Sequence, residues 1–317
     1  MDVTLNVRRF DPESESPESR FQEYNLEVED YFTVLDALIK VREEVDGSLA
    51  LRCSCRASIC GSCSMRVNGH AKLVCKTKVR DVANAQNQVT VEPMGNLPVV
   101  KDLVSDMKPF WDRVRAVKPY LQPEGEEPEA EYLAPNETML HLAGVMSCIM
   151  CGACVSDCTA IEVDQRFLGP AALAKAYRFV GDPRDDADRS RLQMYSQPGG
   201  IWDCTRCMEC VQVCPKGVAP MDRIMGLRDM AIEAGFSNNN GARHTEAFTD
   251  SIKHSGRLDE LKLPLRTFGV FNVQAMMGLS LVGLRAFLRG KTPPIIHKAI
   301  PGKDKVRRLF DKVEGKR

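Results

Sequence analysis

The sequence predicts an α+β protein with a strand-rich N-terminal domain, an all-helical domain after it and a helical C-terminal extension. Strand-like alternation is confined to residues 1–110, whereas residues 136–236 show helical periodicity. All thirteen cysteines fall in three short windows, residues 53–75, 148–158 and 204–214. We expect the chain to divide into a first domain, a linker, a helical domain and an extension, over residues 1–120, 121–135, 136–240 and 241–317.

Composition narrows the class of protein. A chain of 317 residues, 44% of them hydrophobic and 27% charged, is long and apolar enough to bury the cores of two domains. Its formal net charge of zero argues against a nucleic-acid-binding protein that works by neutralising phosphates. The N-terminal segment "MDVTLNVRRFDPESES" has no apolar run of signal-peptide length, so we expect no export through a cleaved signal.

The first domain begins with two strands and a helix. "VTLNV" (3–7) and "YNLEV" (24–28) alternate as half-buried strands do. Thr33 is a suitable N-cap, with Asp36 three residues later, and Gly47 is a suitable end for the helix. One face of this helix is apolar, formed by Val34, Leu38, Val41 and Val45.

The rest of this domain is predicted to complete a sheet. "SMRVNGHAKLVC" (64–75) has an Asn-Gly turn between two strand-like runs, which predicts a hairpin, and "VTVEP" (89–93) is a final strand. Strands, helix, cysteine loop and hairpin in this order are typical of a β-grasp ferredoxin domain.

A polar linker and a helical region follow. "LQPEGEEPEAEY" (121–132) has no apolar period and is rich in Glu, Pro and Gly. "GPAALAKAYRFV" (169–180) and "MDRIMGLRDMAIEAG" (221–235) have helical patterns, and "FSNNNGAR" (236–243) interrupts them.

The first cysteine window predicts a [2Fe–2S] cluster. Cys55-x4-Cys60-x2-Cys63, with Cys75 further on, is the spacing of plant-type ferredoxins. A zinc site or buried free thiols are the alternatives, and zinc sites favour two separated Cys pairs. Cys53 does not fit the spacing, and we expect it to pack as a small apolar residue.

The second and third windows repeat one spacing. Both read Cys-x2-Cys-x2-Cys-x3-Cys, the pattern of bacterial two-cluster ferredoxins, in which the fourth cysteine of each run binds the other cluster. This crossing predicts one [4Fe–4S] cluster on Cys148, Cys151, Cys154 and Cys214. It leaves the third cluster, also predicted to be [4Fe–4S], to Cys158, Cys204, Cys207 and Cys210.

No catalytic group is predicted in this chain, and no cofactor site beyond the clusters. The five histidines are scattered without paired spacing. "RGKT" (289–292) does not form a phosphate loop, because Arg285 stands where the motif needs its first glycine. No glycine fingerprint for a dinucleotide is present, so we expect the chain to conduct electrons and to leave flavin or NAD chemistry to a partner.

With these residues the chain resembles the iron–sulfur subunit of succinate dehydrogenase and fumarate reductase, over roughly residues 1–236. The resemblance depends on five segments: "CRASICGSC", "LPVVKDLVSDM", "KPYLQP", "GPAALAKAYRFVGDPRDD" and "VCPKG". It implies a peripheral subunit of a complex attached to the cytoplasmic face of the cell membrane. A partner flavoprotein carrying FAD would hold the active site and oxidise succinate. Electrons would pass from FAD through [2Fe–2S], [4Fe–4S] and the third cluster to quinone.

The chain departs from that family around the third cluster. Cys207 stands where members of the family have an aliphatic residue and a [3Fe–4S] cluster, which is the alternative for the third cluster here. Thr159 replaces a proline, Thr205 replaces a histidine, and "TAIEVDQ" lacks the tryptophans that help to form the quinone pocket. We therefore expect quinone to meet the complex through its anchor subunit.

The extension has a resemblance of its own. "HSGRLDELKLPLRTFG" (254–269) is similar to the end of the small ferredoxin subunit of heterodisulfide reductase, whose partner is a cysteine-rich subunit with CCG motifs. A membrane anchor or a CCG-type subunit is thus the expected second partner. Residues 267–284 are uncharged but contain Asn272 and Gln274, which favours an interfacial or partner-covered helix over a membrane span.

Three functions are consistent with these patterns. The first is the electron-transfer subunit of a succinate:quinone oxidoreductase. The second is the same subunit in a fumarate reductase with a thiol or quinol donor. The third is a stand-alone ferredoxin-like carrier, against which the interdomain segments and the long extension argue.

Overall fold

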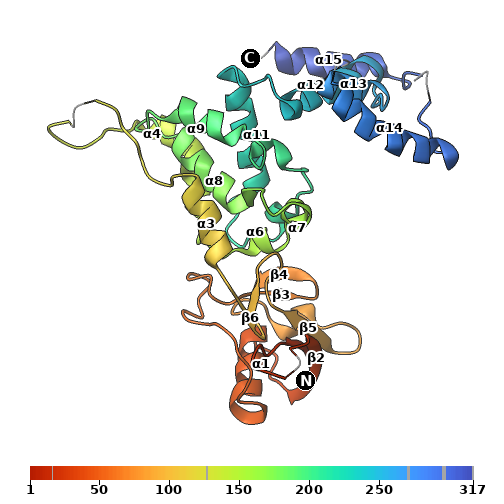
Figure 1. Ribbon diagram of the computed structural model, residues 1–317. Helices are drawn as coiled ribbons and strands as arrows, with labels where there is room; N and C mark the ends of the chain where they lie inside the picture. The colour runs from red at the N-terminus through yellow and green to blue at the C-terminus, as the bar shows by residue number, and fades with distance from the viewer. Residues whose placement is uncertain (16, 126–127, 270–271, 295–297, 316–317) are drawn as a thin grey trace. The chain divides into compact units, whose positions relative to one another are not determined.

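The computed structural model describes residues 1–15, 17–125, 128–269, 272–294 and 298–315. The chain forms two compact units, Met1–Met230 and Ala231–Arg317. Each unit is described by itself below, with the elements labelled as in Figure 1.

The first unit begins with a five-stranded mixed sheet in the order β2-β1-β5-β3-β4. Its strands are β1 (Asp2–Arg9), β2 (Arg20–Glu27), β3 (Ser64–Val67), β4 (His70–Leu73) and β5 (Gln88–Glu92). β1 pairs antiparallel with β2 and parallel with β5, while β3 pairs antiparallel with both β4 and β5. The predicted strands are therefore present, and the β-grasp arrangement is confirmed.

One helix packs against this sheet, as the capping pattern predicts. In α1 (Val34–Lys40) the Thr33 hydroxyl accepts the Asp36 N–H at 3.2 Å, and the Asp36 carboxylate accepts the Thr33 N–H at 3.0 Å. This reciprocal capping satisfies two N–H groups that a helix start leaves unpaired. The helix continues as a π-helical turn, η1 (Val41–Val45). Val34, Leu35 and Leu38 are buried in one core with the inward side chains of the sheet.

The hairpin β3–β4 turns at Asn68 and Gly69, whose φ angles are +50° and +84°. Two successive residues in the left-handed region give the turn that matches the twist of the strands, which is why Asn-Gly is favoured there. The Asn68 side chain also accepts the Thr90 N–H at 2.9 Å and donates to the Val82 carbonyl at 2.7 Å. The turn is thereby fixed to the neighbouring β5.

Short elements then lead from the sheet into a helical region. They are β6 (Val99–Lys101), β7 (Val104–Ser105) and α3 (Lys108–Ala116), whereas α2 (Val79–Val82) lies between β4 and β5. The helical region contains α4 (Asn136–Met139), η2 (Leu140–Leu142), α5 (Ala143–Met146), α6 (Ala153–Ser156), α7 (Thr159–Val163), α8 (Gly169–Val180), α9 (Asp188–Tyr195), η3 (Ile201–Asp203), α10 (Glu209–Gln212) and α11 (Pro220–Glu233). α8 lies at the centre, buried along most of its length and in contact with α3, α5, α6 and α9.

The first residues of the predicted linker are hydrogen-bonded to this helical region. The backbone N–H groups of Gln122 and Glu124 donate to the carboxylates of Asp185 and Asp186 at 3.0 and 2.8 Å. The Asp186 N–H returns a hydrogen bond to the Gln122 carbonyl at 3.1 Å. Acidic side chains that follow α8 thus order a segment whose own composition predicts no structure.

The second unit is helical. It contains α12 (Asn240–Ser255), α13 (Lys262–Phe268), α14 (Val273–Leu288) and α15 (Lys303–Glu314). Asn239 caps α12 by accepting the Ala242 N–H at 2.9 Å, and α12 contacts both α13 and α15.

The uncharged stretch at 267–284 is not one helix. It is divided at Gly269, which ends α13, and residues 270–271 within it lie outside the described residues. In the described parts of the chain, no helix combines the length and apolar character needed to cross a membrane.

Candidate iron–sulfur sites

The loop between η1 and β3 is shaped to surround sulfur atoms. Arg56 and Ser58, at φ +53° and +56°, curl the backbone around the Cys55 thiol. Three N–H groups, those of Ala57, Ile59 and Cys60, point at Cys55 Sγ from 3.3, 3.4 and 3.3 Å. Converging backbone N–H groups stabilise the negative charge of a thiolate.

The four cysteines predicted for [2Fe–2S] lie together. Hydrogen bonds from the Ser62 side chain, and from the backbone at Cys55 and Ser62, lower the pKa of Cys60 to about 6. Burial raises the pKa of Cys63 to about 12, and the nearby Cys75 and Cys60 thiols add to this shift. Cys53 is outside the group and packs, partly buried, against the core of the sheet and α1.

The second group of thiols lines an apolar hollow in the helical region. Cys148, Cys151, Cys154 and Cys214 all face it, from two segments far apart in the sequence. The apolar part of its wall comes from Ile149, Ala153, Ala171, Ala174, Val218 and Pro220. Burial raises the pKa of Cys154 far above its usual value, and the charges of the other three thiols and Cys210 contribute. The Val218 N–H lies 3.4 Å from Cys214 Sγ. The structure thus brings together the four cysteines that the crossed pattern groups.

The third group is also brought together. Burial raises the pKa of Cys158, and the Cys207 and Cys204 thiols raise it further. Burial raises the pKa of Cys210 to about 12, with contributions from Cys204, Cys158 and Cys207. At Cys207 burial also acts to raise the pKa, but hydrogen bonds from Thr159, Glu209 and Thr205 outweigh it and lower the pKa.

The backbone around Cys207 repeats the backbone around Cys151. Met150 and Gly152, on either side of Cys151, have φ +57° and +81°, and α6 begins directly afterwards. Arg206 and Met208, on either side of Cys207, have φ +60° and +70°, and α10 begins directly afterwards. Left-handed φ is uncommon for Arg and Met, so its repetition at equivalent positions indicates that the same local geometry is imposed on both cysteines.

These arrangements fit clusters better than single ions. Within the described ranges, no three His, Cys, Asp or Glu side chains lie where they could share one metal ion. The second group of thiols surrounds a hollow instead, which suits a multinuclear cluster whose iron atoms each take a separate thiolate. The zinc alternative for the first window also lacks its two separated Cys pairs.

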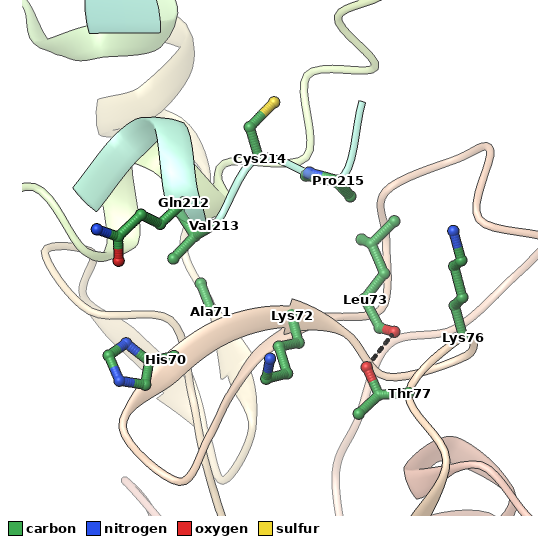
Figure 2. A pocket seen from close by; sticks show the side chains of 10 residues that line it. All are labelled: His70, Ala71, Lys72, Leu73, Lys76, Thr77, Gln212, Val213, Cys214 and Pro215. Carbon is green, nitrogen blue, oxygen red and sulfur yellow. Dashed lines mark hydrogen bonds between the residues drawn. The ribbon is translucent and has the colours of Figure 1, made fainter. Parts of the chain in front are cut away.

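A cleft of about 490 Å³ opens where β4 approaches the segment around Cys214 (Figure 2). Lys72 and Lys76 line one wall, and Gln212 and Pro215 line the other. Figure 2 shows the Cys214 sulfur directed away from the lysine wall. Cys214 and Pro215 line both this cleft and the apolar hollow of the second group.

Two supporting residues could not be identified from the sequence. Arg228, buried on α11, donates to the carbonyls of Ile201, Trp202 and Cys204 at 2.8, 3.0 and 2.8 Å, and burial lowers its pKa to about 10. The Asn96 side chain donates to the Cys158 carbonyl at 3.0 Å. Both side chains fix the position of the backbone at or next to a candidate ligand. They do so through contacts between residues that are distant in the sequence.

Comparison with known proteins agrees with this arrangement. Residues 4–112 match the family model of a 2Fe-2S iron-sulfur cluster binding domain, and residues 144–218 match that of a 4Fe-4S dicluster domain. The chain is 35% identical to the 8-methylmenaquinol:fumarate reductase iron-sulfur subunit of Wolinella succinogenes, over 86% of this chain and 87% of that protein. It is 36% identical to the succinate dehydrogenase iron-sulfur subunit of Paracoccus denitrificans, over 72% of this chain and 88% of that one.

A solved structure is also similar. A chain of the Mycobacterium smegmatis Sdh1 complex in the apo form aligns with a TM-score of 0.68 and 26% identity, over 75% of this chain and 98% of that one. Residues 1–236 are less than three quarters of this chain, so the Wolinella succinogenes match, at 86%, also includes part of the extension. The chain therefore belongs to the family of succinate dehydrogenase and fumarate reductase iron–sulfur subunits, and it is an electron-transfer protein with a 2Fe-2S domain and a 4Fe-4S dicluster domain.

Proposed function

We propose that this chain carries electrons between a flavoprotein that oxidises succinate and a quinone-reducing membrane partner. The observation that supports this most directly is the presence of three groups of four cysteines in one compact unit. Clusters bound there would take up and release single electrons. The active site and FAD belong to the partner flavoprotein.

The proposed ligands are those predicted by the spacing. Cys55, Cys60, Cys63 and Cys75 hold [2Fe–2S]; Cys148, Cys151, Cys154 and Cys214 hold one [4Fe–4S]; Cys158, Cys204, Cys207 and Cys210 hold the other. For Cys207, the repeated backbone geometry supports a [4Fe–4S] rather than a [3Fe–4S] third cluster.

The flavoprotein docks at the first cysteine loop. Cys55 and Cys60 are exposed, and Ile59 between them leaves 64% of its surface in solvent. An exposed apolar side chain among cluster ligands suits a partner surface that excludes water at the point of electron entry. Lys72 and Lys76 in the adjacent cleft offer positive charge to acidic side chains of that partner.

The test is purification of the native protein followed by assay. We expect an FAD-containing flavoprotein to co-purify, and the complex to reduce an artificial quinone with electrons from succinate. A chain that elutes alone and accepts electrons from unrelated donors would instead indicate a stand-alone carrier.

The fumarate reductase alternative has one observation in its favour. The match to the Wolinella succinogenes fumarate reductase subunit reaches into the extension, which the Paracoccus denitrificans match, at 72% of the chain, need not do. The two directions are distinguished by titrating the midpoint potential of the last cluster. A potential near or above that of the cell's quinone pool favours fumarate reduction, because the cluster then accepts electrons from quinol. A potential below that of the pool favours succinate oxidation, because the cluster then donates electrons to quinone.

The extension attaches the complex to a membrane anchor or a CCG-type subunit at the cytoplasmic face of the membrane. In α14 one face exposes Val273, Met277, Leu281, Leu284, Phe287 and Leu288. Residues 285–317 carry eleven Lys/Arg and three Asp/Glu. An apolar helix face followed by basic residues suits an anionic membrane surface or an acidic partner.

A further inference from the structure

Gly61 in the first cysteine loop lies directly against Cys151 of the second thiol group. A Cβ atom placed on Gly61 would be 2.8 Å from Cys151 Cβ and 2.9 Å from Cys151 Cα. Carbon atoms in favourable contact are about 3.5–4.0 Å apart, so no side chain fits at this position. The φ angle of Gly61 is +73°, which independently favours glycine.

This contact joins two ligand segments. Gly61 follows Cys60 directly and precedes Cys63 by two residues, and both cysteines are proposed ligands of the [2Fe–2S] cluster. Cys151 is a proposed ligand of the neighbouring [4Fe–4S] cluster. The two ligand-bearing segments therefore approach each other closely at Gly61, where the Cα and Cβ atoms of Cys151 leave no room for a side chain.

A second set of contacts holds the same two parts of the unit together. The Asn96 side chain donates to the carbonyls of Val155, Ser156 and Cys158 at 2.8, 3.1 and 3.0 Å. It thereby ties the segment between β5 and β6 to the last turn of α6, the helix that contains Cys154, and to the Cys158 carbonyl at the start of α7. The Gly95 N–H donates to the Ser156 hydroxyl at 3.0 Å, and a Cβ on Gly95 would lie 2.6 Å from the Ser156 carbonyl oxygen.

We propose that Gly61 is a positioning residue that sets the separation of the first and second clusters, and that Gly95 and Asn96 hold this separation. This inference rests on the ligand assignments proposed above. Electron tunnelling between two centres slows steeply as their distance grows. A side chain at position 61 would force the two backbones apart by several tenths of an ångström, because packed interiors have no free volume to absorb it.

The test compares two alanine variants in the purified holo-complex. In Gly61→Ala, alanine must adopt a φ that is unfavourable for it, and its Cβ would also lie too close to Cys151. In Gly69→Ala, alanine must also adopt an unfavourable φ, since Gly69 has φ +84°, but its Cβ would meet no atom within 4 Å. The readout is the enhancement of [2Fe–2S] electron-spin relaxation by the reduced neighbouring cluster, which falls with distance, alongside iron content and midpoint potentials.

We expect Gly61→Ala to retain its iron and the potentials of both clusters, while the relaxation enhancement falls measurably below the wild-type value and electron transfer between the clusters slows. Gly69→Ala should match the wild type. If Gly61→Ala fails to assemble, Gly95→Ala and Asn96→Ala, which alter no residue of the cysteine loop, should weaken the enhancement in the same direction. Wild-type enhancement in all variants that assemble would overturn the proposal.

Failure of the ligand assignments would look different. In that case the wild type itself would lack one of the two cluster signals, or would show two signals without mutual relaxation. The inference about Gly61 is overturned only when the wild type shows the coupling and the variants leave it unchanged.

Discussion

Cys207 is the second of four cysteines in the third cysteine window, and the structure provides a reason to regard it as a ligand. The left-handed residues on both sides of it reproduce those on both sides of Cys151. Its thiol lies close enough to Cys158 and Cys210 to influence the pKa of both. Cys207 is exposed, and four hydrogen bonds, two from Thr159 and one each from Thr205 and Glu209, favour its ionised form, which is the form that binds iron.

We predict that Cys207→Ile converts the third cluster to [3Fe–4S]. The wild-type protein, prepared without oxygen, should lack the EPR signal of an oxidised three-iron cluster, and the variant should gain it. Because a fourth iron and its thiolate change the net charge of the cluster, the variant's terminal potential should also shift upward. Cys53→Ala is the control and should leave all cluster signals intact. A strong three-iron signal in the wild type would show that Cys207 is not a ligand.

Among single residues, the sequence predicts the features that depend only on residues nearby in the sequence. The capping pair Thr33–Asp36 and the turn at Asn68–Gly69 are local, and both are present as predicted. The roles of Asn96 and Arg228 depend on carbonyl groups that only the fold brings near them. A polar residue in a loop and an arginine in a helix give no sequence signal of such contacts.

Among the elements, α9 is attached by one buried arginine to the segment that follows α3. Arg191 donates to the carbonyls of Val117, Lys118 and Tyr120 at 3.0, 2.8 and 2.7 Å. It also forms a buried ion pair with Asp185 at 2.9 Å. Asp185 in turn accepts the Gln122 N–H, so this pair organises the chain from residue 117 to residue 122.

We predict that Arg191→Ala lowers the free energy of unfolding by about 3–5 kcal/mol, because it leaves the Asp185 carboxylate buried without its partner. Urea unfolding followed by circular dichroism measures this. Arg115→Ala is the matched control, since the Arg115–Asp112 pair is exposed, and its removal should change stability little. Equal effects of the two substitutions would show that Arg191 does not anchor the segment.

The elements also show where sequence prediction ends. α8 spans Gly169–Val180, as its periodicity predicts, because its own apolar residues determine which faces are buried. The ordered start of the linker depends instead on Asp185 and Asp186, about sixty residues away. The end of α13 at Gly269 depends on the backbone conformation of that glycine. A hydropathy pattern does not predict it, because a glycine does not interrupt an uncharged, apolar stretch.

For the whole molecule, the three thiol groups imply a chain of electron carriers that begins at the exposed loop. We predict that Cys60→Ala abolishes the [2Fe–2S] EPR signal and stops electron flow from the flavin to an artificial quinone. Oxidation of succinate by the flavoprotein with a dye that accepts electrons directly from flavin should persist and serves as the control. Normal succinate–quinone activity in a variant that lacks this cluster would exclude the proposed order of carriers.

The second unit can be tested apart from the clusters, since no proposed ligand lies beyond Cys214. We predict that deletion of residues 262–317 releases the complex from the membrane or from its CCG-type partner, with all cluster signals retained. The deletion removes the apolar face of α14 and the basic residues after it together. Sedimentation of membranes and EPR of the released fraction measure the two outcomes. Loss of both [4Fe–4S] signals would show that the extension contributes to the core of the cluster domain.

Deletion also uncovers α12, because the Arg243 side chain donates to the Thr267 carbonyl of α13 at 2.9 Å. A double variant, Leu281→Glu and Leu284→Glu, avoids this, since these side chains are 64% and 55% exposed on α14. We predict that it folds and keeps its clusters but loses attachment, because two carboxylates on the apolar face oppose burial in lipid or against a partner. Val45→Glu is the control, at a 58% exposed apolar residue of the N-terminal domain, and should remain attached. Full attachment of the double variant would assign the binding to the basic residues rather than to the face of α14.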